Sequence, residues 1–197
     1  MILSGAFITV QAQGLELRRY ILPTDTVTDE GVTFVASSDD AEQENDAIDA
    51  LFDDDIDAGW EGEPEDQNIL TAGMRFRDIF LPKGATIDSA FIIVHSHESK
   101  TAADVANLTI VGDANDFSPT FTEDSLIDAR ARTNAQIDWT VDEPWGLWTP
   151  HRTPDVSAIV QEIIDRDGWE TGNPLTFIIL GEDQGPSEVE NAREWES

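Results

Sequence analysis

The sequence contains no cysteine and only two lysines, Lys83 and Lys100. Without cysteine, disulfides and thiolate metal sites are excluded, and the redox compartment is left undecided. The chain has 41 acidic residues against 11 basic ones and a formal net charge of −30. Such a surface repels a phosphate backbone, which argues against binding to nucleic acid. The acidity fits a solvated surface, salty surroundings or a bound divalent cation.

Long hydrophobic runs are also missing, so we predict no insertion into a membrane. The most apolar segment, 175–180, has the length of a buried strand. The first 13 residues have an apolar centre, but no Lys or Arg precedes it, so they resemble a strand more than a signal peptide. Its period of two places these small apolar residues on one inward face: Ala6, Ile8, Val10 and Ala12.

One amphipathic helix is predicted at 153–167. Thr153 is a good N-cap, Pro154 suits the first helical position, and Gly168 suits the end of the helix. Residues at i, i+3, i+4 and i+7 form its apolar stripe: Val156, Ile159, Val160 and Ile163.

The other periodic segments predict strands. They are separated by turns rich in Gly, Pro and Asp: 15–22, 32–36, 69–81, 86–96, 108–112, 137–141 and 175–180. The segment 24–31 reads as a polar connector. The acid-rich segment 37–67 reads as a long surface loop with one helical turn around 47–52. This pattern indicates a mainly β protein, an antiparallel β-sandwich with one helix.

Three blocks of sequence together resemble a known module: Met74-Arg75-Phe76, then Pro82 with Gly84-Ala85-Thr86-Ile87, and Trp169 with Gly172-Asn173. The segment 38–42 (SDDAE) matches its usual opening. The chain from 31 to 197 is similar to jelly-roll modules, like carbohydrate-binding modules, in secreted and surface proteins of marine and environmental bacteria. The resemblance implies a non-enzymatic, extracellular jelly-roll sandwich, and it assigns no ligand.

The resemblance also divides the chain into an N-terminal arm, 1–30, and the jelly-roll sandwich, 31–197. The module normally continues beyond the element that matches 192–197 into a final apolar strand. We therefore expect the N-terminal strand, with Ala6, Ile8 and Val10 facing inward, to replace that strand. It would fill the groove of its own subunit or, as we prefer, of a neighbouring one, since an open sheet edge invites strand addition.

Acidic residues in the segment 37–67 are candidate ligands for Ca²⁺, which prefers carboxylate oxygens. One set is Asp53, Asp55 and Asp57, and the other is Asp39, Asp40 and Glu42. The spacing fails the EF-hand pattern, because Ala58 occupies the position of its glycine. A solvated acidic loop is the alternative interpretation for both sets.

Histidines and tryptophans supply the remaining candidates. His95 and His97 are two ligands of a possible transition-metal site without an identifiable third. No spacing supports a catalytic triad or a catalytic carboxylate pair, so we do not expect an enzyme. Aromatic rings in polar, turn-rich segments are candidate glycan platforms, with local core packing as the alternative: Trp60, Trp145 and Trp148.

Two functions remain. The first, which we favour, is a structural and adhesive surface protein, a virion or filament subunit that contacts itself or other structural subunits through strand addition. The alternative is a secreted carbohydrate-binding module. A normally exported fold without a persuasive export signal favours the first, because virion proteins leave the cell by lysis. Both place the protein outside the cell or on a virion surface.

Overall fold

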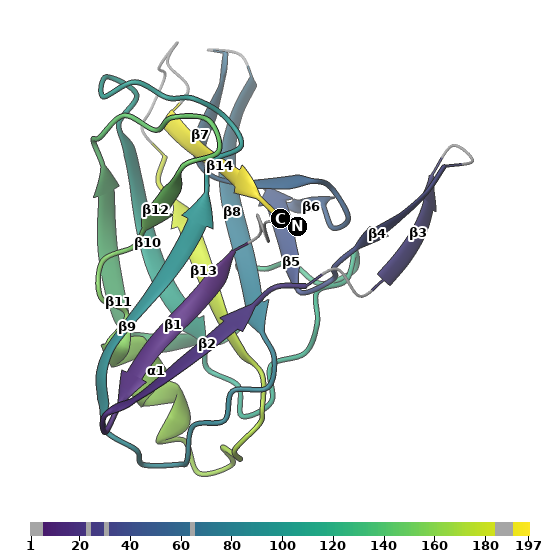
Figure 1. Ribbon diagram of the computed structural model, residues 1–197. Helices are drawn as coiled ribbons and strands as arrows, with labels where there is room; N and C mark the ends of the chain where they lie inside the picture. Colours follow the sequence, from purple (N-terminus) through teal and green to yellow (C-terminus); the bar gives the residue numbers. More distant parts are fainter. Residues whose placement is uncertain (1–5, 23–24, 30–31, 64–65, 184–190) are drawn as a thin grey trace.

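The computed structural model describes residues 6–22, 25–29, 32–63, 66–183 and 191–197. These residues form two antiparallel sheets that face each other, a separate two-stranded hairpin and one helix (Figure 1). The predicted antiparallel β-sandwich with one helix is confirmed. The single described helix is too short to cross a membrane.

The elements have these bounds in chain order: β1 (Phe7–Ala12), β2 (Leu15–Tyr20), β3 (Asp25–Asp29), β4 (Val32–Ala36), β5 (Asp40–Glu44), β6 (Ala47–Ala50), β7 (Asp55–Glu63), β8 (Asp66–Phe76), β9 (Ile87–His95), β10 (Ala106–Asp113), β11 (Arg132–Val141), β12 (Pro150–Arg152), α1 (Ser157–Ile164), β13 (Leu175–Gly181) and β14 (Asn191–Glu196).

The smaller sheet has the strand order β12-β9-β1-β2. β1 lies inside it, with Ile8 paired to Ile92 on one side and to Arg19 on the other. Ala6, Ile8 and Val10 are at most 1% exposed, so the predicted inward face is confirmed. β1 and β2 are thus built into the sandwich of their own chain. The preferred arrangement, transfer to a neighbouring subunit, is not the one in this structure, and residues 2–5 of the predicted strand lie outside the described residues.

The larger sheet has the order β11-β10-β13-β8-β5-β6, and β7 joins it at β8. Leu70 of β8 pairs with Glu44 of β5 on one edge and with Gly59 of β7 on the other. β7 therefore continues the edge of β8 that β13 occupies further along. Gly181 lies at this junction, where a Cβ atom would be 2.0 Å from the carbonyl oxygen of Gly59.

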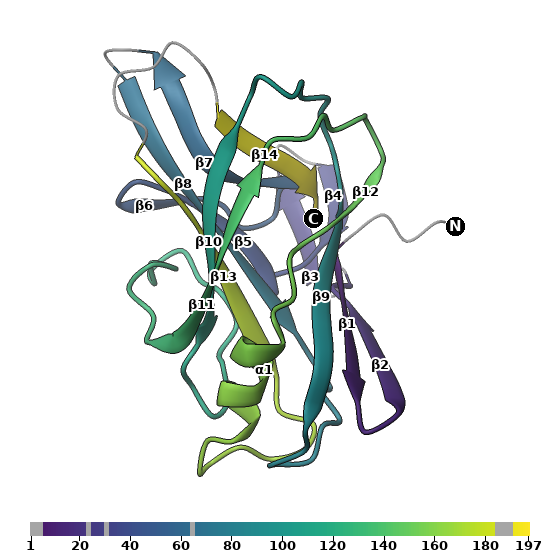
Figure 2. The ribbon, with the colours of Figure 1, turned by 90° about the vertical axis from the view of Figure 1, so that its left-hand side faces the viewer.

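The helix closes one end of the sandwich between the two sheets (Figure 2). It contacts β9 of the smaller sheet and β10 and β11 of the larger one. Its predicted apolar stripe is fully buried, which confirms that prediction: Val156, Ile159, Val160 and Ile163. Burial of this stripe is what holds so short a helix in place, since isolated helices of this length are unstable in water.

The predicted start of the helix at Thr153 and Pro154 is wrong. The Thr153 hydroxyl instead accepts a hydrogen bond from the Ile92 amide of β9, 3.0 Å away. The Asp155 carboxylate accepts from the amides of Ser157 and Ala90 at 2.9 and 3.0 Å. These side chains connect the segment before α1 to β9, so the helix begins at Ser157.

The predicted surface loop at 37–67 is also wrong, because it contains β5, β6, β7 and the beginning of β8. The expected helical turn at 47–52 includes the short strand β6. In β7 the inward residues Ile56, Ala58 and Trp60 are at most 3% exposed, and acidic residues alternate with the first two. The high count of acids concealed a period-two pattern that indicates a strand.

The predicted connector at 24–31 includes strand β3, which pairs with β4. This hairpin extends away from the body of the sandwich (Figure 1). Within the described part of the chain, neither of its strands pairs with a third strand. The hairpin therefore has two open edges.

Candidate functional site

β7 and β14 form an antiparallel ribbon at the end of the sandwich opposite α1 (Figure 1). Their register pairs Asp57 with Glu194 and Asp55 with Glu196. The residues between them turn inward, and Ile56, Ala58 and Trp195 belong to the core. The alternation of β-strands thus gathers four carboxylates on the other face of the ribbon, here called the acidic face: Asp55, Asp57, Glu194 and Glu196.

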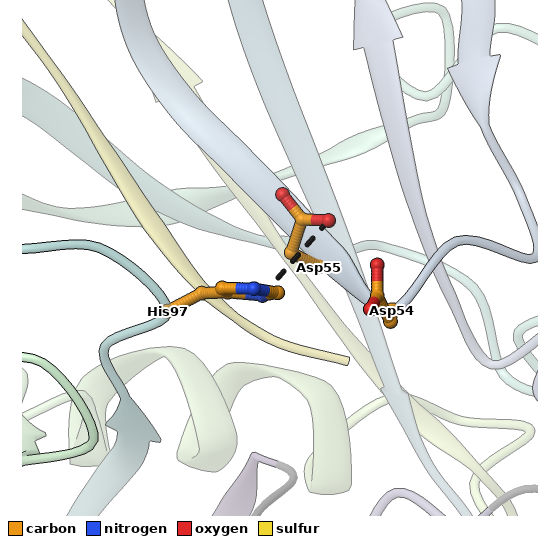
Figure 3. A group of neighbouring side chains, drawn as sticks. All are labelled: Asp54, Asp55 and His97. Carbon is orange, nitrogen blue, oxygen red and sulfur yellow. Dashed lines mark ion pairs between the residues drawn. The ribbon is translucent and has the colours of Figure 1, made fainter.

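His97 is positioned over the acidic face by backbone contacts. Ser96 forms a β-bridge with Trp195, and the His97 amide donates to the Glu194 carbonyl at 3.1 Å. Its Nδ1 atom lies 3.3 Å from Glu196 Oε1, 3.8 Å from Glu194 Oε1 and 4.0 Å from Asp55 Oδ1. Figure 3 shows the imidazole facing Asp55, with Asp54 beside it. The Nδ1 atom of one imidazole therefore lies within 4.0 Å of three carboxylates.

Burial and mutual repulsion raise the pKa values of these carboxyl groups. The pKa of Asp57 rises to about 9, mainly through burial and then through Glu42 and Glu194. That of Glu194 rises to about 7, through burial and then Asp55. Burial also raises the pKa values of Asp55 and Glu196, whereas His97 lowers both. The cluster is short of positive charge, a condition that a bound cation would relieve.

Two groups of ligand atoms lie within 4.8 Å of one another in the described residues. One consists of Asp54, Asp55 and His97, and the other of Asp55, Asp57 and Glu194. Asp55 belongs to both. Two residues of the predicted calcium set Asp53, Asp55 and Asp57 are thus brought together, but neither group contains Asp53.

The second predicted calcium set does not converge in the described structure. Asp39 forms ion pairs with Arg75, which is buried, and with Arg77 at 2.5 Å, so it already has cationic partners. Asp40 and Glu42 are buried in β5, and burial raises their pKa values to about 7 and about 8. Glu42 accepts the amide of Asp57 at 2.7 Å. Glu42 therefore lies next to Asp57 of the acidic face.

Trp148 presents an exposed ring beside His97. Its side chain is 55% exposed, and the two rings stack with centroids 5.5 Å apart. Its backbone has φ = 61°, a conformation that non-glycine residues adopt rarely. A hydrogen bond of 2.8 Å from its amide to the Ser96 carbonyl holds it there. The backbone conformation that holds this ring at the surface is thus energetically unfavourable.

The other two predicted glycan platforms are wrong as surface sites. Trp60 and Trp145 are each only 2% exposed. Trp145 stacks against His151 at 4.1 Å and lies 5.5 Å from the Arg193 guanidinium, which is also buried. Local core packing, the alternative interpretation, applies to both, and Trp145 supports the turn that carries Trp148.

Sequence reasoning missed Asp54, Glu194 and Glu196. The two glutamates come from β14, more than a hundred residues after β7, and no local spacing reveals that pairing. The signal for β14 was the alternation of Arg193 and Trp195, which are fully buried, with Glu194 and Glu196 of the acidic face. His97, which the sequence had singled out, belongs to one of the ligand groups, but neither group of the described residues includes His95.

No protein-family model and no curated protein matches this chain.

Proposed function

We propose that this protein is a non-enzymatic adhesive module of the cell exterior or of a virion surface, and that Trp148 binds a glycan. The main support for glycan binding is that Trp148 is an exposed indole held in an unfavourable backbone conformation. Flat aromatic rings stack on the apolar faces of sugar rings, and an indole offers the largest such surface. The neighbouring carboxylates can accept hydrogen bonds from hydroxyl groups.

The charge of the protein restricts the kind of glycan. A chain with a net charge of −30 repels uronic acids and sulfated sugars. The acidic face lies next to Trp148 through His97, so this repulsion acts at the site itself. We therefore expect a neutral polysaccharide as the ligand.

Affinity electrophoresis tests this proposal, with laminarin, xylan and mannan as neutral polysaccharides and alginate as an anionic one. At least one neutral polysaccharide should retard the protein, and alginate should not. Trp148→Ala should abolish the retardation. Phe117→Ala is the matched control, because Phe117 is also a surface aromatic, 60% exposed, and lies outside the site.

Three results would overturn the proposal. They are a lack of retardation by every neutral polysaccharide, equal retardation of the Trp148→Ala variant, and release of reducing sugar by the protein. The last would show an enzyme.

The β3–β4 hairpin favours a second function, that of a structural subunit in a filament or virion. Two-stranded hairpins are at best marginally stable alone in water, and this one has open edges on both sides. Strand addition from another copy or from another structural subunit would stabilise it. In light scattering the whole protein should form oligomers, and removal of residues 25–36 should leave monomers. A monomeric whole protein at high concentration would exclude self-assembly.

A further inference from the structure

We propose that His97, Asp55, Asp54 and Glu196 bind one divalent transition-metal ion, of the kind represented by Zn²⁺. This site shares Asp55 with one predicted calcium set, but it differs from that set because it includes a nitrogen ligand and a residue of β14. It does not depend on glycan binding by Trp148.

A buried oxygen without a hydrogen-bond partner is the first reason. Glu196 is only 9% exposed, and its Oε1 accepts no hydrogen bond from the described residues. His97 Nδ1, 3.3 Å away, is likewise buried and without a hydrogen bond. Buried polar atoms in native proteins nearly always have a bonding partner. Two such atoms that face each other without a hydrogen bond therefore indicate a missing partner between them. A metal ion between them would satisfy both.

One pair of atoms has the separation of two ligands that share an ion. Bonds of about 2.0–2.1 Å in a tetrahedral site place ligand atoms about 3.3–3.4 Å apart. The separation between Glu196 Oε1 and His97 Nδ1, 3.3 Å, agrees with this value. Asp54 and Asp55 offer further oxygens within 4.8 Å of the same imidazole (Figure 3). Glu196 approaches this group through His97, so the site requires the carboxylates of Asp54 and Asp55 to move toward that pair.

Glu194 lies beside the proposed ligands. Its Oε1 atom is 3.8 Å from His97 Nδ1, and its carboxyl group belongs with Asp55 to the second ligand group. Neighbours that orient a metal ligand commonly strengthen binding.

The donor set selects the ion. Imidazole and carboxylate ligands together suit Zn²⁺ and its neighbours in the first transition row, whereas Ca²⁺ takes six to eight oxygens. His97 is what distinguishes the two cases. Without it the cluster would contain oxygens only.

Titration calorimetry at pH 7.5 on chelator-treated, untagged protein tests the proposal. Zn²⁺ should bind with one ion per chain, and Ca²⁺ at millimolar concentration should not prevent it. His97→Ala should weaken Zn²⁺ binding by at least a hundredfold and Glu196→Gln by about tenfold. Asp138→Asn is the matched control, because it removes an exposed carboxylate of β11 and should bind Zn²⁺ like the wild type.

A spectroscopic readout keeps the test decisive should a variant fail to fold. Co²⁺ bound to the wild-type protein should give the visible absorption of a four-coordinate site, and Zn²⁺ should displace it. Absence of Zn²⁺ binding, Zn²⁺ binding that survives His97→Ala, or Ca²⁺ binding of equal strength would each overturn the proposal. Absence of Zn²⁺ binding would mean that His97 interacts with its carboxylates only through a hydrogen bond or an ion pair.

Discussion

Asp57 and Glu194 lie directly opposite each other on β7 and β14, so that two carboxyl groups share one position of the acidic face. Like charges in such cross-strand pairs are destabilising. The pKa values of both groups are raised, to about 9 for Asp57 and about 7 for Glu194. Both groups therefore keep their protons to a higher pH in the folded protein than in the unfolded chain.

The stability of the metal-free protein should fall as the pH rises from about 5 to 9. An acid with a raised pKa keeps its proton in the folded state after the unfolded chain, with a pKa near 4, has released it. Between the two pKa values the folded state binds more protons, so each increase in pH reduces the free energy of unfolding. Urea unfolding in chelator across this range measures the effect.

Asp57→Asn should remove part of this dependence and stabilise the protein at pH 9 by about 1–3 kcal/mol, since one pKa unit corresponds to about 1.4 kcal/mol. Asp138→Asn, on an exposed position of β11, should leave the slope unchanged. A pH profile of Asp57→Asn that coincides with that of the wild type would show that Asp57 ionises normally.

Ile159→Asp should destabilise the protein by about 2–5 kcal/mol, because it places a charge in the buried stripe of α1. Ala158→Asp is the matched control on the exposed side of the same helix and should cost less than about 1 kcal/mol. Thermal melting of both variants checks the prediction, and equal melting temperatures would contradict it.

Ile8→Asp should destabilise the protein by about 3–5 kcal/mol, since Ile8 is fully buried between the sheets. Thr9→Asp, one residue further on the opposite face of β1, should be tolerated within about 1 kcal/mol.

Deletion of residues 1–13 should prevent folding, because it removes a strand between β9 and β2, and a synthetic peptide of these residues should restore it. A soluble, folded deletion variant would show that β1 is dispensable.

Gly181→Ala should destabilise the protein by about 1–3 kcal/mol or more. Its Cβ atom would lie 2.0 Å from the Gly59 carbonyl oxygen and 2.7 Å from that of Leu70, and neither backbone can move without loss of strand pairing. Gly146→Ala is the control, because its nearest contact would be an ordinary 3.4 Å. Chemical denaturation should show a midpoint shift for the first variant only.

The elements that depend on local periodicity were predictable from the sequence. The stripe of α1 and the apolar strands β9, β10 and β13 were found because each reveals its period within a few residues. β7 was missed, because its outward positions carry so many acids that Ile56, Ala58 and Trp60 did not stand out as an alternation. β5 was missed because its acids Asp40 and Glu42 are themselves buried, which is rare for acidic residues.

The candidate site was predictable only in part. His97, Asp55 and Trp148 were singled out by residue type, but their proximity depends on the register of β14 against β7 and on the bridge from Ser96 to Trp195. Registers between segments so far apart in sequence are set by the packing of the whole sandwich. A short sequence window contains no trace of them.

The pairing of β7 with β14 joins distant parts of the chain, and the Ser197 hydroxyl donates to the Asp53 carbonyl across 144 positions. Contacts of this kind form late and slowly, because a large loop must close first. We therefore expect the acidic residues of β7 to stay apart from those of β14 until that closure, so that their repulsion acts on the last step of folding. Divalent ions or high salt should therefore accelerate the end of folding more than its beginning.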